Sequence, residues 1–238
     1  TTDRLVCVLS DIQNMGYEVV LVSSGAIAVG RNKLNMTAKP YSMRMKQAAA
    51  AVGQCSLMYL YDKFFGDYDK TVAQILLNAD DIEEEEKKEN LINTFNALLE
   101  MGVIPIVNEN DSVSYKEIES EDRLFGDNDM LSAVVAVLCR AKHLVIFSDI
   151  DGFYDHDPRL YPNEQLIDQI DTIDDSVYAL AGGAGSRRGT GGMRTKLQAA
   201  SLATSQGTNT IVTNGKRPEV LYDIVKGGRA GTLFPGKI

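Results

Sequence analysis

Short apolar runs rich in β-branched residues alternate along the chain with segments of helical periodicity. Runs of this kind are typical of strands buried in a parallel sheet. Between them, apolar residues recur at three- and four-residue spacings, as at Leu5, Val8 and Ile12. The alternation predicts an α/β fold, a three-layer α/β/α sandwich with a mostly parallel central sheet. The expected strands are residues 19–22, 71–77, 103–107, 143–147 and 209–213.

Two of the expected helices contain segments that could be mistaken for functional motifs. The small residues of Ala48–Ala51 and Gly53, within a long helix at 45–65, favour close packing over chemistry. The acidic run at 83–89 is interpreted as the solvated face of a helix, because Phe95 and its apolar neighbours lie at helical spacing beyond it.

Every expected strand ends in small or polar residues. The carboxyl ends of parallel strands meet at one edge of a sheet, and ligands bind there. The pattern therefore predicts a ligand site along this edge. The residues concerned are Ser23-Ser24-Gly25, Asn78, Asn108–Asp111, Ser148-Asp149 and Thr213-Asn214-Gly215.

Composition narrows the possible functions of this 238-residue chain. A hydrophobic content of 44% and a charged content of 24% are ordinary for a globular protein. The net charge of -9 argues against a nucleic-acid surface, and no apolar run is long enough to span a membrane. Cys7, Cys55 and Cys139 are expected to be buried free thiols of a reducing compartment, which favours a cytoplasmic location. Only His143 and His156 are present, which disfavours a histidine-based metal site or catalytic relay.

A glycine-rich segment runs from Gly189 to Lys196 and leads into a helix. Glycine lets the backbone approach a ligand closely, and a helix N-terminus favours anions. Lys196 adds a positive charge within the first turns of that helix. The segment matches neither of the two common nucleotide-binding glycine motifs. By itself the segment is therefore as consistent with a flexible connection as with a phosphate site.

Two acidic clusters suggest the second ligand. They are Asn108-Glu109-Asn110-Asp111, directly after an expected strand, and Gly126-Asp127-Asn128-Asp129, at a helix start. A helix cap needs one such residue, and the second cluster has three. Carboxylates beside amides suit a ligand that carries both an ammonium and a carboxylate group. The clusters therefore indicate an amino-acid site facing the phosphate site.

In this order, the motifs resemble those of the glutamate 5-kinases, which belong to the amino-acid kinase family. The resemblance rests on Val22–Ile27, the two acidic clusters, and Gly189–Met193 followed by Lys196. It implies the amino-acid kinase fold and transfer of a phosphoryl group from ATP, with Mg²⁺, to the side-chain carboxylate of L-glutamate. That reaction is the first step of proline biosynthesis in the family.

The resemblance also implies roles for individual residues. Ser24, Asp111 and Asn128 are expected to bind glutamate. Lys196 would offset charge on the phosphoryl group in transfer, and Asp129 would orient the catalytic lysines. No side chain is identified as a metal ligand. The expected ATP-binding residues are Ser148, Asp149, Thr190, Gly191, Gly192, Met193, Arg194, Thr195 and Lys196.

Further expectations follow from the family. Residues 112–125 correspond to a region that senses proline, so feedback inhibition is a hypothesis. A homo-oligomer, dimer or tetramer, and glutamate-5-semialdehyde dehydrogenase (γ-glutamyl phosphate reductase) as a functional partner are expected. Residues 1–238 are interpreted as one kinase domain that lacks the family's first, lysine-bearing strand and a C-terminal RNA-binding-like domain. The alternatives are a non-catalytic amino-acid or proline sensor of the same fold, and a kinase for N-acetylglutamate, aspartate or carbamate.

Overall fold

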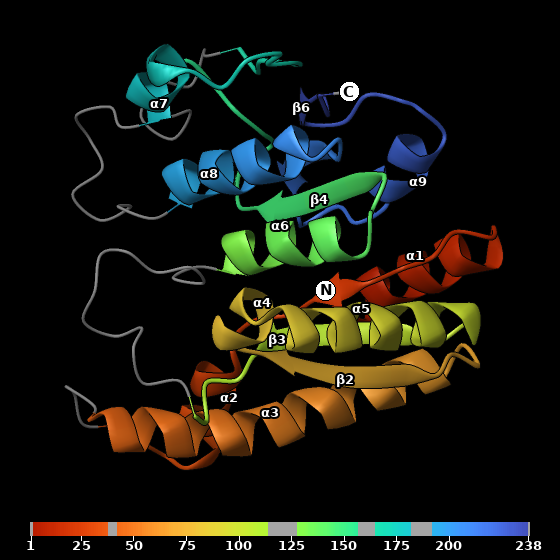
Figure 1. Ribbon diagram of the computed structural model, residues 1–238, viewed down its shortest axis with the longest axis vertical. Coiled ribbons are helices and arrows are strands. Elements are labelled where there is room, and N and C mark those ends of the chain that lie inside the picture. The colour runs from red at the N-terminus through yellow and green to blue at the C-terminus, as the bar shows by residue number, and fades with distance from the viewer. Residues whose placement is uncertain (1, 38–41, 114–127, 157–164, 182–191, 238) are drawn as a thin grey trace. The chain divides into compact units, whose positions relative to one another are not determined.

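The computed structural model describes residues 2–37, 42–113, 128–156, 165–181 and 192–237. The chain divides into two compact units, called here the N-terminal unit (residues 2–128) and the C-terminal unit (residues 129–238). Each unit contains its own three-stranded sheet with helices packed against it (Figure 1).

In the N-terminal unit, a parallel sheet has the strand order β1-β3-β2. β3 (Ile104–Glu109) lies in the middle, and its first five residues are buried. β1 (Leu21–Val22) and β2 (Val72–Leu77) flank it. Because Val22 and Ile75 both pair with Val107, the carboxyl ends of the three strands lie at the same edge. The helices are α1 (Thr2–Asn14), α2 (Ala26–Lys33), α3 (Met43–Gly66), α4 (Asp80–Glu83) and α5 (Glu85–Glu100).

Helices α2 and α3 lie side by side, with their backbones in direct contact at two glycines. A Cβ atom added to Gly30 would lie 1.7 Å from the carbonyl oxygen of Ala49. One added to Gly53 would lie 1.7 Å from the carbonyl oxygen of Ala26. Neither position has room for any side chain, so the crossing depends on these two glycines. The expectation that the small residues of this helix serve close packing is confirmed.

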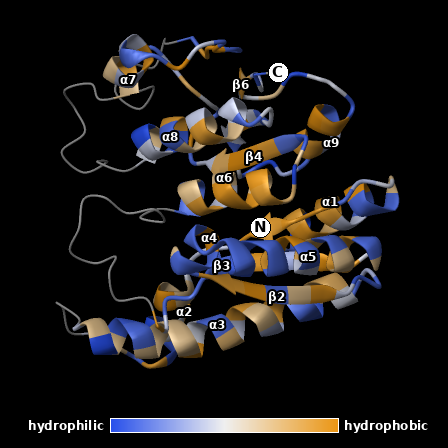
Figure 2. Cartoon of the chain, viewed as in Figure 1, coloured by the Kyte–Doolittle hydropathy of each residue, from blue (hydrophilic) through white to orange (hydrophobic). Residues whose placement is uncertain are grey.

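In the C-terminal unit, β4 (His143–Ser148) pairs in parallel with β5 (Asn209–Asn214), and β6 (Thr232–Phe234) pairs antiparallel with β5. The helices are α6 (Asn128–Leu138), α7 (Asp175–Ala181), α8 (Gly192–Ser205) and α9 (Val220–Val225). Figure 2 shows α6 coloured mostly as hydrophobic, whereas α5 mixes hydrophilic and hydrophobic residues. A helix that is apolar on every side is a buried one, and six residues of α6 are buried.

The predicted α/β class with mostly parallel strands is confirmed, with differences of detail. The described strands form two three-stranded sheets, β1-β3-β2 and β4-β5-β6, and no described strand pairs across the two. β6 was not predicted, since three residues are too few to show an alternating pattern. The strand expected at 19–22 pairs only at Leu21 and Val22, although Val19 is buried.

The expectation of buried cysteines is wrong. Cys55 is exposed, and Cys7 and Cys139 are half-buried. Cys55 lies on α3 immediately after the buried residues Gly53 and Gln54, so it falls on the helix's outer side. Among the described helices, none combines the length and the apolarity that crossing a bilayer requires.

Candidate active site

The carboxyl ends of β1 and β3 bring two predicted motifs to the same edge of the N-terminal sheet. Ser23 follows β1, and its backbone N–H donates a hydrogen bond to the Val107 carbonyl at 2.8 Å. Asn108 is the next residue of β3, so Ser23 and Asn108 lie at adjacent strand ends. The turns that leave these strands carry Ser24 and Asp111, the two residues of this sheet edge that were expected to bind glutamate.

The turn after β1 is shaped for a ligand. Gly25 has φ 91°, a left-handed conformation that side chains disfavour, and it precedes α2. Ser24 is exposed beside this helix start, where backbone N–H groups face outward. Asp111 is half-buried in the turn that directly follows β3. Hydroxyl, backbone N–H and carboxylate groups at one sheet edge are the groups that recognise an amino acid.

Two side chains of α3 support these strand ends. The Asn108 side chain is 2% exposed, and its Nδ2 donates to Oε1 of Gln54 at 2.8 Å. Its Oδ1 accepts a hydrogen bond from the backbone N–H of Glu109 at 2.9 Å. The Ser23 hydroxyl, also buried, lies 2.9 Å from the hydroxyl of Tyr61. Both polar groups are therefore held by hydrogen bonds inside the unit rather than by solvent.

In the C-terminal unit, the first turns of α6 and α8 are joined by an ion pair. Nζ of Lys196 lies 2.7 Å from Oδ2 of Asp129, and the two side chains are 13% and 12% exposed. The Thr195 hydroxyl donates to the same oxygen at 3.1 Å. Such a shielded pair is held firmly, because removing either charge would leave the other in a poorly solvated place. Asp129 and Lys196, the two residues expected to be catalytic, are thus in contact.

The core of this unit fixes the ends of both helices. Ala133 of α6 and Leu197 of α8 are fully buried in one cluster with Ile146 of β4 and Val212 of β5. Leu197 directly follows Lys196, so packing of the helix determines where the lysine side chain starts. The backbone at the first residue of α8 is uncovered, since a Cβ added to Gly192 would meet nothing within 4 Å.

The carboxyl ends of β4 and β5 are linked by a backbone hydrogen bond. The backbone N–H of Gly215 donates to the Ser148 carbonyl at 3.0 Å, and the Ser148 hydroxyl donates to Asp149 at 3.4 Å. Nδ2 of Asn214 donates to Asp151 at 2.9 Å. Burial, followed by the charge and hydrogen bond of Asp151, raises the pKa of Tyr154. Ser148 and Asp149, expected to bind ATP, therefore lie at the carboxyl end of a parallel strand.

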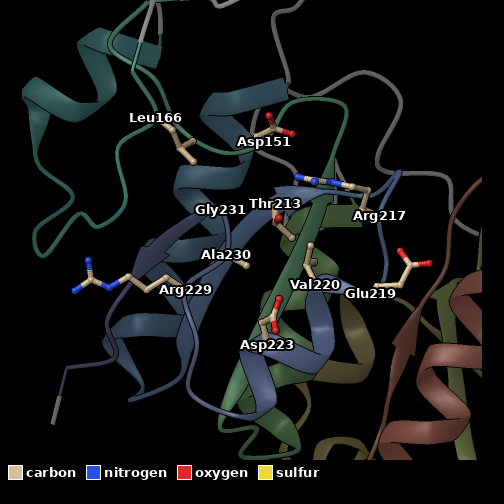
Figure 3. A pocket seen from close by; sticks show the side chains of 10 residues that line it. All are labelled: Asp151, Leu166, Thr213, Arg217, Glu219, Val220, Asp223, Arg229, Ala230 and Gly231. Atoms are coloured by element: carbon tan, nitrogen blue, oxygen red, sulfur yellow. The ribbon is translucent and has the colours of Figure 1, made fainter.

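A cavity of about 430 Å³ opens beside this edge (Figure 3). Figure 3 shows Arg217 extending toward Asp151, Asp223 projecting from α9, and Arg229 pointing away from the others. Carboxylates, guanidinium groups and apolar side chains in one hollow suit a polar ligand with an apolar part. The lining residues are Asp151, Leu166, Thr213, Arg217, Glu219, Val220, Asp223, Arg229, Ala230 and Gly231.

The structure describes most of the predicted positions. Asp129, Thr195 and Lys196 are in contact, and Asn128 begins α6 immediately before Asp129. Gly192, Met193 and Arg194 form the first turn of α8. Thr190 and Gly191 lie outside the described residues, as do Gly126, Asp127 and most of the expected proline-sensing segment 112–125.

Sequence reasoning missed the supporting residues. Gln54 follows a run of mostly small residues in α3, and a polar residue next to the tightly packed Gly53 was the available signal. Tyr61 carries no comparable signal, because aromatic residues are common in helices. The cavity residues of α9 and its flanking turns were also missed, since Arg217 and Asp223 read as ordinary surface charges.

Comparisons with known proteins show which proteins this chain resembles. The model of the amino acid kinase family matches residues 1–214. The glutamate 5-kinase of Clostridium perfringens is 55% identical over 99% of this chain and 87% of its own length. That of Listeria innocua is 49% identical over 100% of this chain and 86% of its own length.

Solved structures with the same fold share far less sequence. The isopentenyl phosphate kinase of T. acidophilum has a TM-score of 0.60 at 18% identity, covering 98% of this chain and 88% of its own. The UMP kinase of Bacillus anthracis has a TM-score of 0.62 at 14% identity, covering 99% and 86%. These likenesses concern the fold alone. With a family model matching nine-tenths of its residues, the chain belongs to the amino-acid kinase family.

Proposed function

We propose that this chain is a glutamate 5-kinase, which transfers the γ-phosphoryl group of ATP to the side-chain carboxylate of L-glutamate. The observation that carries the proposal is the 55% identity to the Clostridium perfringens glutamate 5-kinase over 99% of the chain. The turns at the ends of β1 and β3 add the groups that an amino-acid substrate requires.

Within this proposal, Ser24, Asp111 and Asn128 bind glutamate. The carboxylate of Asp111 suits the substrate ammonium group, whereas the Ser24 hydroxyl and the Asn128 amide suit its carboxylates. Ser148, Asp149 and the segment from Thr190 to Lys196 bind ATP. The N-terminus of α8 supports this role, because its first N–H groups and Lys196 favour phosphate oxygens.

In the reaction, a side-chain carboxylate oxygen of glutamate attacks the γ-phosphorus. The bond from that phosphorus to the bridging oxygen breaks, and ADP leaves with the electron pair. Lys196 stabilises negative charge on the phosphoryl oxygens, and Asp129 holds the ammonium group of Lys196 in place through the 2.7 Å contact. Positioning and charge neutralisation supply most of the acceleration in phosphoryl transfer.

Mg²⁺ is expected to arrive with ATP, because this ion usually binds through phosphate oxygens and only one or two carboxylates. Within the described part of the chain, no three metal-binding side chains cluster together. The proposal also includes proline as a feedback inhibitor, a homo-oligomeric state and a cytoplasmic location. It includes glutamate-5-semialdehyde dehydrogenase as the acceptor of the product.

The test measures ADP release by the purified protein with ATP, Mg²⁺ and one candidate acceptor at a time. L-glutamate should support turnover, whereas N-acetylglutamate, aspartate and carbamate should not. Hydroxylamine in the same assay should trap the acyl phosphate product as a hydroxamate. Turnover with another acceptor would contradict the proposal in favour of a related kinase. Glutamate binding without ADP release would instead favour a non-catalytic sensor.

A further inference from the structure

Two hydrogen bonds from one helix reach the two strand ends that lead into the glutamate-binding turns. Gln54 and Tyr61 lie seven residues apart on α3, which places them about two turns apart on the same face. Gln54 contacts Asn108 at the end of β3, and Tyr61 contacts Ser23 after β1. β1 and β3 are neighbours, so one helix face spans both turns.

We propose that Gln54 and Tyr61 are positioning residues for glutamate, acting through Asn108 and Ser23. The inference rests on the function proposed above, because it gives these residues their purpose. Neither residue needs to touch the substrate. Each fixes the backbone of a turn that carries a substrate-binding side chain, Asp111 in one case and Ser24 in the other.

The Gln54–Asn108 pair is too deeply buried to be a surface contact. Its two residues are 8% and 2% exposed, and the neighbouring residues Ala49, Ala50 and Gly53 of α3 are also buried. Polar groups at such a place cost stability unless they are hydrogen-bonded, and apolar residues would pack there at no such cost. A neutral amide pair here is therefore best explained by the geometry that it imposes.

The pair has a defined orientation. Oδ1 of Asn108 accepts the backbone N–H of Glu109, so Nδ2 is the atom that faces Gln54 and donates to its carbonyl oxygen. This arrangement fixes the last peptide bond of β3, from which the chain enters the turn with Asp111. A rotated Asn108 amide would lose its hydrogen bond to the Glu109 N–H.

The position of α3 itself is fixed by the glycine crossing with α2. Gly53 directly precedes Gln54, and its backbone lies against Ala26, the first residue of α2. The helix can neither slide nor move away without losing this contact. Gln54 and Tyr61 therefore extend from a rigid support, which is what a positioning residue requires.

The decisive experiment measures KM for glutamate and for ATP in variants of the full-length protein. Gln54→Met keeps the length of the side chain but removes the acceptor, so KM for glutamate should rise about tenfold, while KM for ATP stays within about twofold. Gln54→Glu keeps an acceptor oxygen and should give an intermediate KM for glutamate. Gln74→Met, at an exposed position of β2, is the matched control and should match the unaltered protein.

Tyr61→Phe tests the second contact, because it removes only the hydroxyl that meets Ser23. KM for glutamate should rise about threefold to fivefold, in line with the loss of one neutral hydrogen bond. Tyr59→Phe on the same helix is the control, since Tyr59 is 68% exposed.

Whether Gln54 acts through Asn108 is tested separately. In an Asn108→Ala background, Gln54→Met should change KM for glutamate by less than about twofold.

Several outcomes would overturn the positioning role. They are an unchanged KM for glutamate in Gln54→Met, an equal rise in KM for ATP, and a Gln54→Glu variant no better than Gln54→Met. A full effect of Gln54→Met in the Asn108→Ala background would do so as well. If the unaltered protein releases no ADP in response to glutamate, the proposed function fails and the positioning role fails with it.

Discussion

The two units hold the polar groups of their candidate functional residues in two different ways. At the ends of β1 and β3, the contacts are neutral, and residues behind the turns make them. Gln54 and Tyr61 hold Asn108 and Ser23, not the predicted ligand-binding residues. At the start of α6 and α8, by contrast, two predicted functional residues hold each other, Asp129 and Lys196, through full charges.

The difference indicates what each region must do. A region that mainly binds and recognises a substrate needs turns of fixed shape. Neutral hydrogen bonds fix that shape without adding charge. A phosphoryl group in transfer needs a positive charge at a defined place, and a shielded carboxylate keeps that charge oriented. We therefore expect damage to the first region to raise KM for glutamate and damage to the second to lower kcat.

The largest effect should come from Lys196→Met. Loss of the positive charge at the transferred phosphoryl group should lower kcat by about 10³-fold, as expected for removing one preorganised electrostatic contact. Lys226→Met, at an exposed position after α9, is the matched control and should leave kcat unchanged. A Lys196→Met variant with normal turnover would refute the role given to this lysine.

The same variant separates stability from catalysis. Without the lysine, the shielded Asp129 carboxylate, which is 12% exposed in the unaltered protein, lacks its ammonium partner, so the free energy of unfolding should fall by about 3 kcal/mol. Adding Asp129→Asn should restore much of that stability but none of the kcat. If both recover together, the loss of activity reflected damage to the fold.

The strand, turn and helix start that carry the predicted residues of both regions could be predicted from the sequence, because each is set by neighbouring residues. The apolar run at 103–107 and the polar residues after it gave β3 and its turn, and the glycines before Lys196 gave the start of α8. The supporting contacts could not be predicted. Gln54 and Asn108 are 54 residues apart, and nothing in either neighbourhood specifies the other. Their meeting depends on how α3 packs, which only the three-dimensional fold determines.

A second prediction concerns the support beneath the neutral region. Gly53→Ala would place a methyl group 1.7 Å from the Ala26 carbonyl oxygen, so α2 and α3 must separate. Thermal unfolding should show a loss of about 3 kcal/mol, and KM for glutamate should rise because Gln54 moves with the helix. Gly66→Ala is the control, since a Cβ there meets nothing within 4 Å. Equal stability of the two variants would show that the crossing tolerates displacement.

A third prediction tests the substrate half directly. Asp111→Ala should raise KM for glutamate about 30-fold, because a charge-assisted contact to the ammonium group is lost, and it should leave KM for ATP within about twofold. Asp62→Ala, at an exposed position on α3, is the matched control. A larger rise in KM for ATP than for glutamate would mean that the roles of the two regions are exchanged.

The smallest effect should be a pH dependence of stability confined to the C-terminal unit. Both histidines, His143 and His156, belong to that unit. Burial, and to a lesser degree Lys142, lowers the pKa of His143, and its Nδ1 is buried. A depressed pKa means that the unfolded chain binds the proton more tightly. The stability from neutral His143 is therefore complete above the ordinary pKa of about 6.5 and is lost as the pH falls through the lower, folded value.

Replacing this histidine should remove that part of the pH dependence. Between pH 7.5 and 5.5, His143→Gln should lower the acid-induced drop in melting temperature by about 1 °C. Amide hydrogen exchange should show faster opening of β4 at the lower pH while β3 is unaffected. Equal acceleration in both strands would mean that acid acts on the two units alike, and the pH dependence would then not distinguish them.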